Sequence, residues 1–222
     1  YEWALAFIIF SAVFDFFDGM MARALDAHSI IGKDLDSLAD DVSFGVAPSL
    51  IVFSLFKEMD YSGAMESLAG VFPYLAFLLS VFSALRLAKF NNDTRQTSSF
   101  VGLPVPANAL FWASLVTGAH DWLVSSNFHP VYLLLLVCLF SWLLVSEIPM
   151  FSLKFKNLSW KDNKTSFIFL LVCIPFLIFL GICSFSAIIV WYILLSLITR
   201  KSNWLLYTSP SPRDKRQSRM PS

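Results

Sequence analysis

DFFDGMMARALDAHSIIGKDLDSLAD, residues 15–40, sets four aspartates at helical spacings within a long apolar sequence. Asp15 and Asp18 are three positions apart, and Asp36 and Asp40 are four positions apart. On two helices each pair would share one face, because side chains three and four positions apart are neighbours on an α-helix. Carboxylates that converge from two helices form an all-oxygen site, which Mg²⁺ and Mn²⁺ prefer. The stretch therefore predicts two neighbouring helices with a divalent-metal site between them.

Hydrophobic sequence on both sides of this stretch places the aspartates in a membrane. Residues 4–17 and 42–56 are almost uninterrupted apolar sequence. Of the 222 residues, 57% are hydrophobic and only 14% are charged, whereas soluble domains carry about 25% charged residues. A carboxylate at membrane depth costs roughly 2.5–3.5 kcal/mol on insertion scales, so an acidic cluster there is a candidate functional site. We predict an all-α, polytopic transmembrane helix bundle that contacts the lipid bilayer.

The aspartates are part of a longer pattern, D-x2-D-G-x2-A-R-x8-G-x3-D-x3-D. Its other fixed positions are Gly19, Ala22, Arg23 and Gly32. The pattern resembles the signature of the CDP-alcohol phosphatidyltransferase family and matches it at every fixed position. The resemblance implies that an alcohol attacks the lipid-linked phosphorus of a CDP-lipid and that CMP leaves.

The resemblance also implies roles for the four aspartates. Asp15, Asp18, Asp36 and Asp40 would hold Mg²⁺ or Mn²⁺, and Asp40 would also be the catalytic residue that takes the proton of the incoming hydroxyl. Metal ligation keeps a carboxylate ionised, so its position would matter more than its basicity. The alternative is that these residues cap helices or form a solvated acidic face.

The remaining signature residues, together with Asp15 and Ser29, are expected to contact the CDP-lipid. Gly19 has no side chain, so a nucleotide can lie close to the backbone there, and Arg23 can donate two hydrogen bonds to phosphate oxygens. Tight helix packing is the alternative role for Gly19 and Ala22, and a charge that anchors the helix at the interface is the alternative for Arg23. The full expected set is Asp15, Gly19, Ala22, Arg23, Ser29 and Gly32, with Gly32 in the break between the helices.

Two later regions resemble the family members that use L-serine as the acceptor. They are LDSLADDVSFGVAPS, residues 35–49, and ALRLAKFN, residues 84–91, followed by FVGLPVPANA, residues 100–109. A zwitterionic acceptor needs a cationic partner for its carboxylate. We expect acceptor contacts from Arg86, Lys89, Asn91 and Arg95, which alternatively only anchor the span at the interface. Glycerol 3-phosphate and inositol phosphate remain alternative acceptors, although a phosphate calls for a denser cluster of cations.

Apolar segments predict seven membrane spans in one domain of residues 1–200. The expected spans cover residues 1–26, 34–56, 67–90, 104–122 and 131–145, and a helical hairpin over 165–199 that breaks near 181–184. Pro48 is expected to kink the second span. Lysine and arginine concentrate on the side of the residue 26–34 turn, which predicts that the site faces the cytosol. We expect a multi-pass protein of a bacterial inner membrane.

The two ends of the chain have separate interpretations. The sequence begins at Tyr1 and runs directly into a helix, whereas family members carry another helix before the signature, so we expect a fragment that lacks this first helix. Residues 206–222 change abruptly to basic, Ser/Pro-rich sequence. We expect a disordered and non-native tail; the alternative is a native basic tail that binds anionic lipid.

Several other functions are disfavoured by the sequence. The formal net charge is zero, so there is no electrostatic case for a nucleic-acid partner. The family resemblance alone suggests a homodimer. A cation-coupled transporter is the rival from another class, because it also keeps carboxylates inside a helix bundle. Transporter sites usually lie between structural repeats, and no repeat is evident in this sequence.

Overall fold

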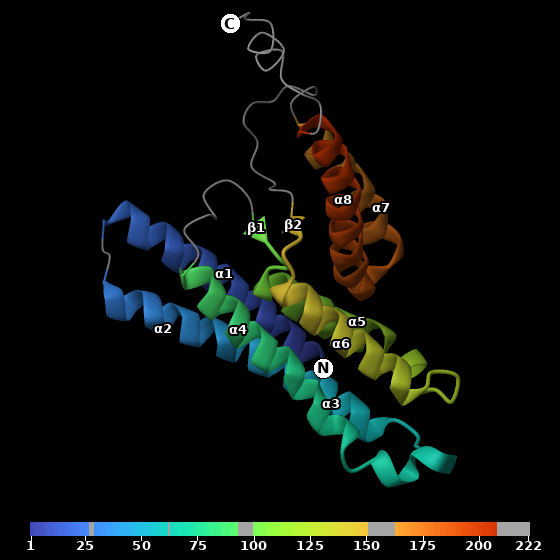
Figure 1. Cartoon of the computed structure of the whole chain (residues 1–222). Helices are drawn as coiled ribbons and strands as arrows, with labels where there is room; N and C mark the ends of the chain where they lie inside the picture. Colours follow the sequence, from blue (N-terminus) through green and yellow to red (C-terminus); the bar gives the residue numbers. More distant parts are fainter. Residues whose placement is uncertain (27–28, 62, 93–99, 151–162, 208–222) are drawn as a thin grey trace, which may run out of the picture.

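Long helices packed side by side make up nearly all of the computed structural model (Figure 1). It describes residues 1–26, 29–61, 63–92, 100–150 and 163–207. The helices of the first half are α1 (Glu2–Ala24), α2 (Ile30–Asp40), the π-helix η1 (Asp41–Val46), α3 (Ala47–Glu58), the 3₁₀ helices η2 (Gly63–Leu68) and η3 (Phe72–Phe77), and α4 (Leu78–Asn92). The second half contains α5 (Val105–Val124), α6 (Pro130–Val145), α7 (Lys164–Phe179), the 3₁₀ helix η4 (Gly181–Cys183) and α8 (Ser184–Tyr207).

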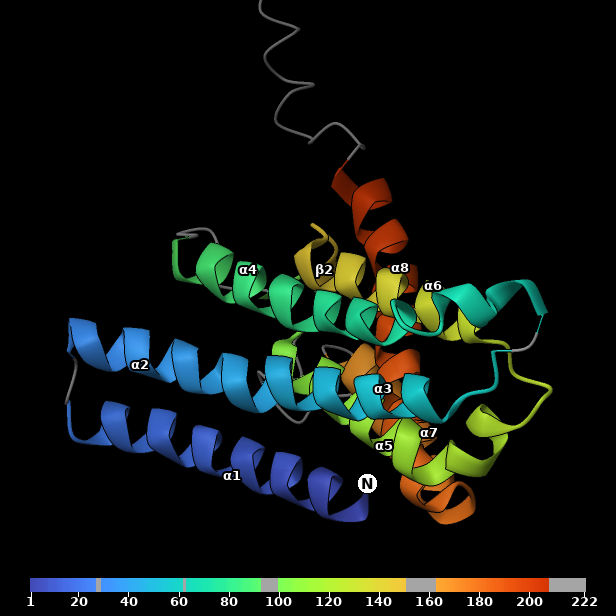
Figure 2. The same ribbon diagram turned by 90° about the horizontal axis from the view of Figure 1, so that it is seen from below.

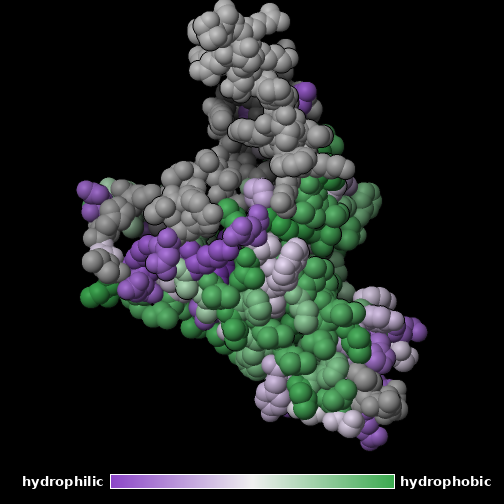
Figure 3. Space-filling model, in the orientation of Figure 1, coloured by the Kyte–Doolittle hydropathy of each residue, from purple (hydrophilic) through white to green (hydrophobic). Residues whose placement is uncertain are grey.

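The predicted all-α membrane bundle is confirmed. Four segments are long and apolar enough to cross a membrane, namely Glu2–Ala22, Ile31–Glu58, Phe72–Asn92 and Gly181–Thr199. Helices α6 and α7 are apolar but shorter. Within the described residues, the one departure from all-α structure is a two-stranded antiparallel ribbon in which β1 (Phe100–Val101) pairs with β2 (Pro149–Met150). Apolar side chains also dominate the outer surface between two polar ends of the molecule (Figure 3).

The second span is one continuous helical rod built from α2, η1 and α3 (Figure 2). A kink was predicted at Pro48; the structure has a π-helical turn just before the proline, in which the Ala47 amide donates to the Val42 carbonyl. Proline has no N–H to continue the α-helical pattern, and the wider turn accommodates that loss. The Ser49 hydroxyl also donates to the Gly45 carbonyl, at 2.7 Å. The rod therefore carries Asp36 and Asp40 on its N-terminal half without a sharp bend.

Helix α5 lies in the middle of the bundle and contacts α1, α3 and α8. Its buried Trp112 and Phe111 pack against Phe140 of α6, with the two phenylalanine rings stacked at a centroid distance of 3.9 Å. The α7–α8 hairpin turns at Gly181, whose φ of +52° is a backbone conformation that glycine adopts without strain. The predicted break near residues 181–184 is confirmed. Ser114 of α5 and Ser186 of α8 hydrogen-bond at 2.5 Å and help to dock this hairpin.

Two sets of long-range contacts set the position of α1 and α4 relative to the rod. At one end, the carboxylate of Glu58 accepts a hydrogen bond from Tyr1 Oη and pairs with His120 Nε2, which joins α3, the start of α1 and α5. At the other end, the Asn91 side chain donates to Ser37 Oγ at 2.7 Å, which joins α4 to α2. These contacts hold the aspartate-bearing ends of α1 and α2 in register.

Candidate metal and nucleotide site

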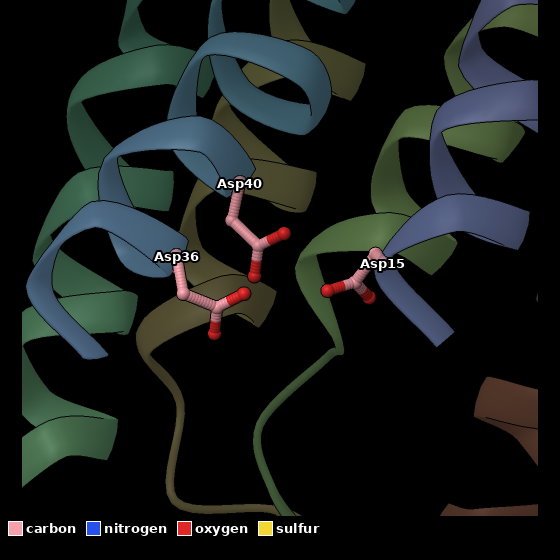
Figure 4. A group of neighbouring side chains, drawn as sticks. All are labelled: Asp15, Asp36 and Asp40. Atoms are coloured by element: carbon pink, nitrogen blue, oxygen red, sulfur yellow. The ribbon is translucent and has the colours of Figure 1, made fainter. Parts of the chain in front are cut away.

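Three of the four signature aspartates converge between α1 and α2. Asp15 projects from α1, and Asp36 and Asp40 project from the facing side of α2 (Figure 4). One carboxylate oxygen from each residue lies within 4.8 Å of the other two. Asp15 and Asp40 are partly buried, and Asp36 is exposed. The arrangement has the donor number and spacing of a cation site.

The charges of these carboxylates favour a bound cation. Two unit charges at this distance repel by roughly 3 kcal/mol at an effective dielectric constant near 20, and three pairs repel at once. Hard oxygen donors with negative charge match a divalent ion such as Mg²⁺ or Mn²⁺. The three residues therefore fit a divalent metal, which would offset two of their three negative charges and hold the two helices together.

Asp18 lies apart from this group of three but beside it. It lines a cavity of about 490 Å³ between α1 and α2. Asp36 belongs to both the cluster and the cavity, so the two are contiguous. The cavity is lined by Asp18, Gly19, Ala22, Ser29, Gly32, Lys33, Leu35, Asp36 and Ala39.

The lining residues follow the helical period on each wall. On α1, Ala22 follows Asp18 by four positions and Gly19 by three, and on α2 every lining residue has another one three or four positions away. Such spacing keeps side chains on one helix face. The fixed positions of the signature thus describe two facing stripes, and the stripes form one cleft.

The two glycines of the cleft have different surroundings. A Cβ built on Gly19 would meet no heavy atom within 4 Å, so the absent side chain leaves space and serves no close helix packing. A Cβ on Gly32 would lie 2.7 Å from Ser29 Oγ, which accepts a hydrogen bond from the Gly32 amide at 2.9 Å and caps α2. Gly32 is therefore inside the first turn of α2, and the expectation that it lies in the break is wrong. The strong N-cap preference of serine explains the earlier helix start.

Comparison with known proteins agrees with this geometry. The model of the family described as CDP-alcohol phosphatidyltransferase matches residues 1–199. The chain belongs to the CDP-alcohol phosphatidyltransferase family. Members of this family are generally dependent on divalent cations, and the three-aspartate cluster is compatible with that dependence. Membership also makes the chain an integral membrane protein, and it removes the transporter alternative.

Similar curated proteins of the family share one name, "CDP-diacylglycerol--serine O-phosphatidyltransferase". The Bacillus subtilis protein is 37% identical over 145 residues, which are 65% of this chain and 72% of that protein. The Helicobacter pylori protein of strain 26695 is 30% identical over 217 residues, or 91% of this chain and 86% of that protein. The Mycobacterium tuberculosis H37Rv protein is 34% identical over 206 residues, or 88% of this chain and 64% of that protein.

The four residues expected to bind the acceptor are placed differently from one another. Arg86 on α4 is 7% exposed and lies close enough to Asp40 for their charges to interact. Lys89 forms an exposed ion pair with Glu147 at 3.4 Å. The Asn91 side chain is already bonded to Ser37. Arg95 is outside the described residues, as is the side chain of Arg23, whose backbone belongs to α1.

Lys33, Leu35 and Ala39 line the cavity, although the family signature leaves their positions open. The signal for Lys33 and Ala39 was present in the sequence, because each is three positions from Asp36 and therefore on its helix face. Lys33 Nζ donates to the Asn91 carbonyl at 3.1 Å while its side chain borders the cavity. It brings a positive charge to a cavity whose other charged groups in the described chain are carboxylates.

Proposed function

We propose that this protein transfers the phosphatidyl group of CDP-diacylglycerol to the hydroxyl of L-serine, which gives phosphatidylserine and CMP. Two observations together carry the proposal. The chain has a three-carboxylate cluster beside a cleft of about 490 Å³, and its curated relatives are named as serine transferases. Further support comes from the regions that resemble serine-using family members, residues 35–49 and residues 84–91 followed by 100–109.

In the proposed reaction the serine oxygen attacks the lipid-linked phosphorus of CDP-diacylglycerol. A bond forms from that oxygen to phosphorus, and the bond from phosphorus to the bridging pyrophosphate oxygen breaks, so that CMP leaves with the bridging oxygen. Asp40 accepts the hydroxyl proton. Asp15, Asp18, Asp36 and Asp40 would hold Mg²⁺ or Mn²⁺, which neutralises phosphate charge in phosphoryl transfer.

The cleft residues would bind the nucleotide end of the substrate. Gly19 leaves room for a cytidine or ribose against α1, and Lys33 and Arg23 supply positive charge for the pyrophosphate. Ser29 Oγ accepts the helix-capping hydrogen bond from the Gly32 amide, and its O–H is left to donate to the nucleotide. We further propose that this end of the bundle faces the cytosol of a bacterial inner membrane and that the protein is a homodimer.

A substrate panel tests the proposal. Purified protein with CDP-diacylglycerol and Mn²⁺ is expected to release CMP faster with L-serine than with glycerol 3-phosphate or inositol phosphate at equal concentration. Asp40→Asn should lower this rate at least 100-fold while the protein still accumulates in membranes, because it removes a ligand and the proton acceptor. A preference for glycerol 3-phosphate would exclude serine as the acceptor, and full activity of Asp40→Asn would exclude its proposed role.

A further inference from the structure

A second group of polar side chains, of which Ser83 and Arg86 are buried and Asp41 is partly buried, lies where η1 and α4 meet, next to the aspartate cluster. It consists of Asp41 on η1 and of Ser83 and Arg86 on α4. One atom of each, Asp41 Oδ1, Ser83 Oγ and Arg86 Nε, is buried and has no hydrogen-bond partner. Buried polar atoms without partners are rare in native proteins, so three of them on two packed elements indicate a missing partner.

Gly45 shows how close the acidic and hydroxyl side chains are. A Cβ built on Gly45 would lie 2.5 Å from Asp41 Oδ1 and 3.0 Å from Ser83 Cβ, so both side chains approach the same backbone position. Arg86 is three positions from Ser83 and therefore on the same face of α4. Since its charge also interacts with that of Asp40, the group borders the residue that we propose as the proton acceptor.

The two charged members of the group are not paired with each other. Among the ion pairs of the described residues, none joins Asp41 to Arg86. Arg86 is 7% exposed and Ser83 is fully buried. A buried charge is stable when an opposite charge and hydrogen bonds compensate it. An α-amino acid can compensate both residues at once, because it carries an ammonium and a carboxylate on one carbon.

We propose that Asp41, Ser83 and Arg86 form the acceptor subsite, which binds a zwitterionic amino alcohol. Asp41 binds the α-ammonium, Arg86 binds the α-carboxylate through its guanidinium, and the hydroxyl arm reaches Asp40. The proposal rests on the proposed function and adds the recognition of the acceptor. Asp41 is then the specificity-determining residue, because its charge attracts an ammonium and repels the phosphate of a glycerol or inositol phosphate.

Little open space borders Arg86 in this structure. The cavity next to it measures about 10 Å³, which is about the room of one water molecule, and it is lined by Lys89 and Phe90 rather than by Asp41 and Ser83. The guanidinium lies over the Phe90 ring at 5.9 Å from its centroid. Binding of an amino acid therefore requires the Arg86 side chain to move away from Phe90 and turn toward Asp41.

Two acceptor analogues separate the two charges in an assay of CMP release from CDP-diacylglycerol. 3-Hydroxypropionate lacks the ammonium of serine, and serinol lacks its carboxylate. Asp41→Asn should raise the KM for serine at least 10-fold and reduce the preference for serine over 3-hydroxypropionate by a similar factor, with its preference over serinol retained. Arg86→Gln should instead reduce the preference for serine over serinol and retain the preference for serine over 3-hydroxypropionate. Neither variant should change the KM for CDP-diacylglycerol by more than about 2-fold.

Matched charge removals elsewhere in the protein serve as controls. Lys57→Gln removes one charge in the last turn of α3, and Asp60→Asn removes one charge just after this helix. Both should leave every acceptor preference unchanged. If Asp41→Asn and Arg86→Gln lower the rates with all three acceptors equally, the subsite is refuted and the proposed function stands. If the wild-type protein prefers glycerol 3-phosphate to serine, the proposed function fails and the subsite fails with it.

A second measurement covers the case in which a variant does not accumulate. Competition against serine with the wild-type protein should show that both analogues inhibit at least 10-fold more weakly than the α-amino acid homoserine, which keeps both charged groups. Equal inhibition by the three compounds would overturn the subsite, because the ammonium and the carboxylate would then not be recognised.

Discussion

Replacing Gly19 with alanine tests whether the cleft between α1 and α2 holds the CDP-lipid. A Cβ at this position meets no heavy atom within 4 Å, so the new methyl group causes no clash with the protein. In a helix interior alanine is favoured over glycine by roughly 1 kcal/mol. The free energy of unfolding should therefore stay the same or increase, in contrast to most substitutions at a functional site.

The same methyl group projects into the cleft and should hinder the substrate. If the nucleotide lies against the backbone of α1, moving it by the width of a methyl group costs on the order of 1–2 kcal/mol in lost contacts. A loss of about 1.4 kcal/mol corresponds to a 10-fold weaker interaction. We therefore expect the KM for CDP-diacylglycerol to rise about 10-fold in Gly19→Ala, and further in Gly19→Leu.

The assay is CMP release in mixed micelles at saturating acceptor, combined with thermal unfolding in detergent. Gly70→Ala is the matched control, because a Cβ there also meets nothing within 4 Å and Gly70 is outside the cleft. Gly70→Ala should change neither the KM for CDP-diacylglycerol nor the thermal unfolding temperature. An unchanged KM in both Gly19 variants would refute substrate binding in the cleft, and a lower unfolding temperature of Gly19→Ala would refute the open space at this position.

Three further predictions concern the supports of the site. Ser29→Ala removes the acceptor of the Gly32 amide and should lower the stability of the first turn of α2 by about 1 kcal/mol, seen as faster hydrogen exchange there; unchanged exchange would contradict the cap. Gly102 has a φ of +77°, and a new Cβ there would lie 2.6 Å from a backbone oxygen, whereas Gly181 has a φ of +52° and open space around its Cβ position. Gly102→Ala should therefore lower the thermal unfolding midpoint more than Gly181→Ala. Equal shifts would contradict the steric argument. Mn²⁺ at 100 times its Kd should stabilise the wild-type protein by about 2.7 kcal/mol and Asp36→Asn by much less, and an equal shift in both would place the ion elsewhere.

Local spacing carried most of the information about the cleft. Asp18, Gly19 and Ala22 line one wall at helical intervals, and the residues around Asp36 line the other. A helical period depends only on neighbours in the chain, so it can be read from the sequence alone. The start of α2 was harder to predict, because it depends on the hydrogen bond between Ser29 and the Gly32 amide.

The residues expected to bind the acceptor show what a local sequence pattern cannot predict, namely the partner of each side chain in the folded protein. Arg86, Lys89 and Asn91 are close together on α4, and the sequence alone predicts the same role for all three. In the folded protein one is buried near Asp40, one forms an exposed ion pair, and one bonds to α2. Which role each takes depends on which helices surround α4, and helix rotation is set by packing.

The amino-acid sequence by itself determined a membrane helix bundle and two acidic helix faces, because apolar run length and helical period are properties of the local chain. Only the tertiary structure decided that Asp15, Asp36 and Asp40 meet while Asp18 borders the cleft. That choice depends on the register of α1 against α2, to which the contacts of Glu58 with Tyr1 and His120 contribute. These residues are 57 and 62 positions apart in the chain, and no local pattern encodes such a distance.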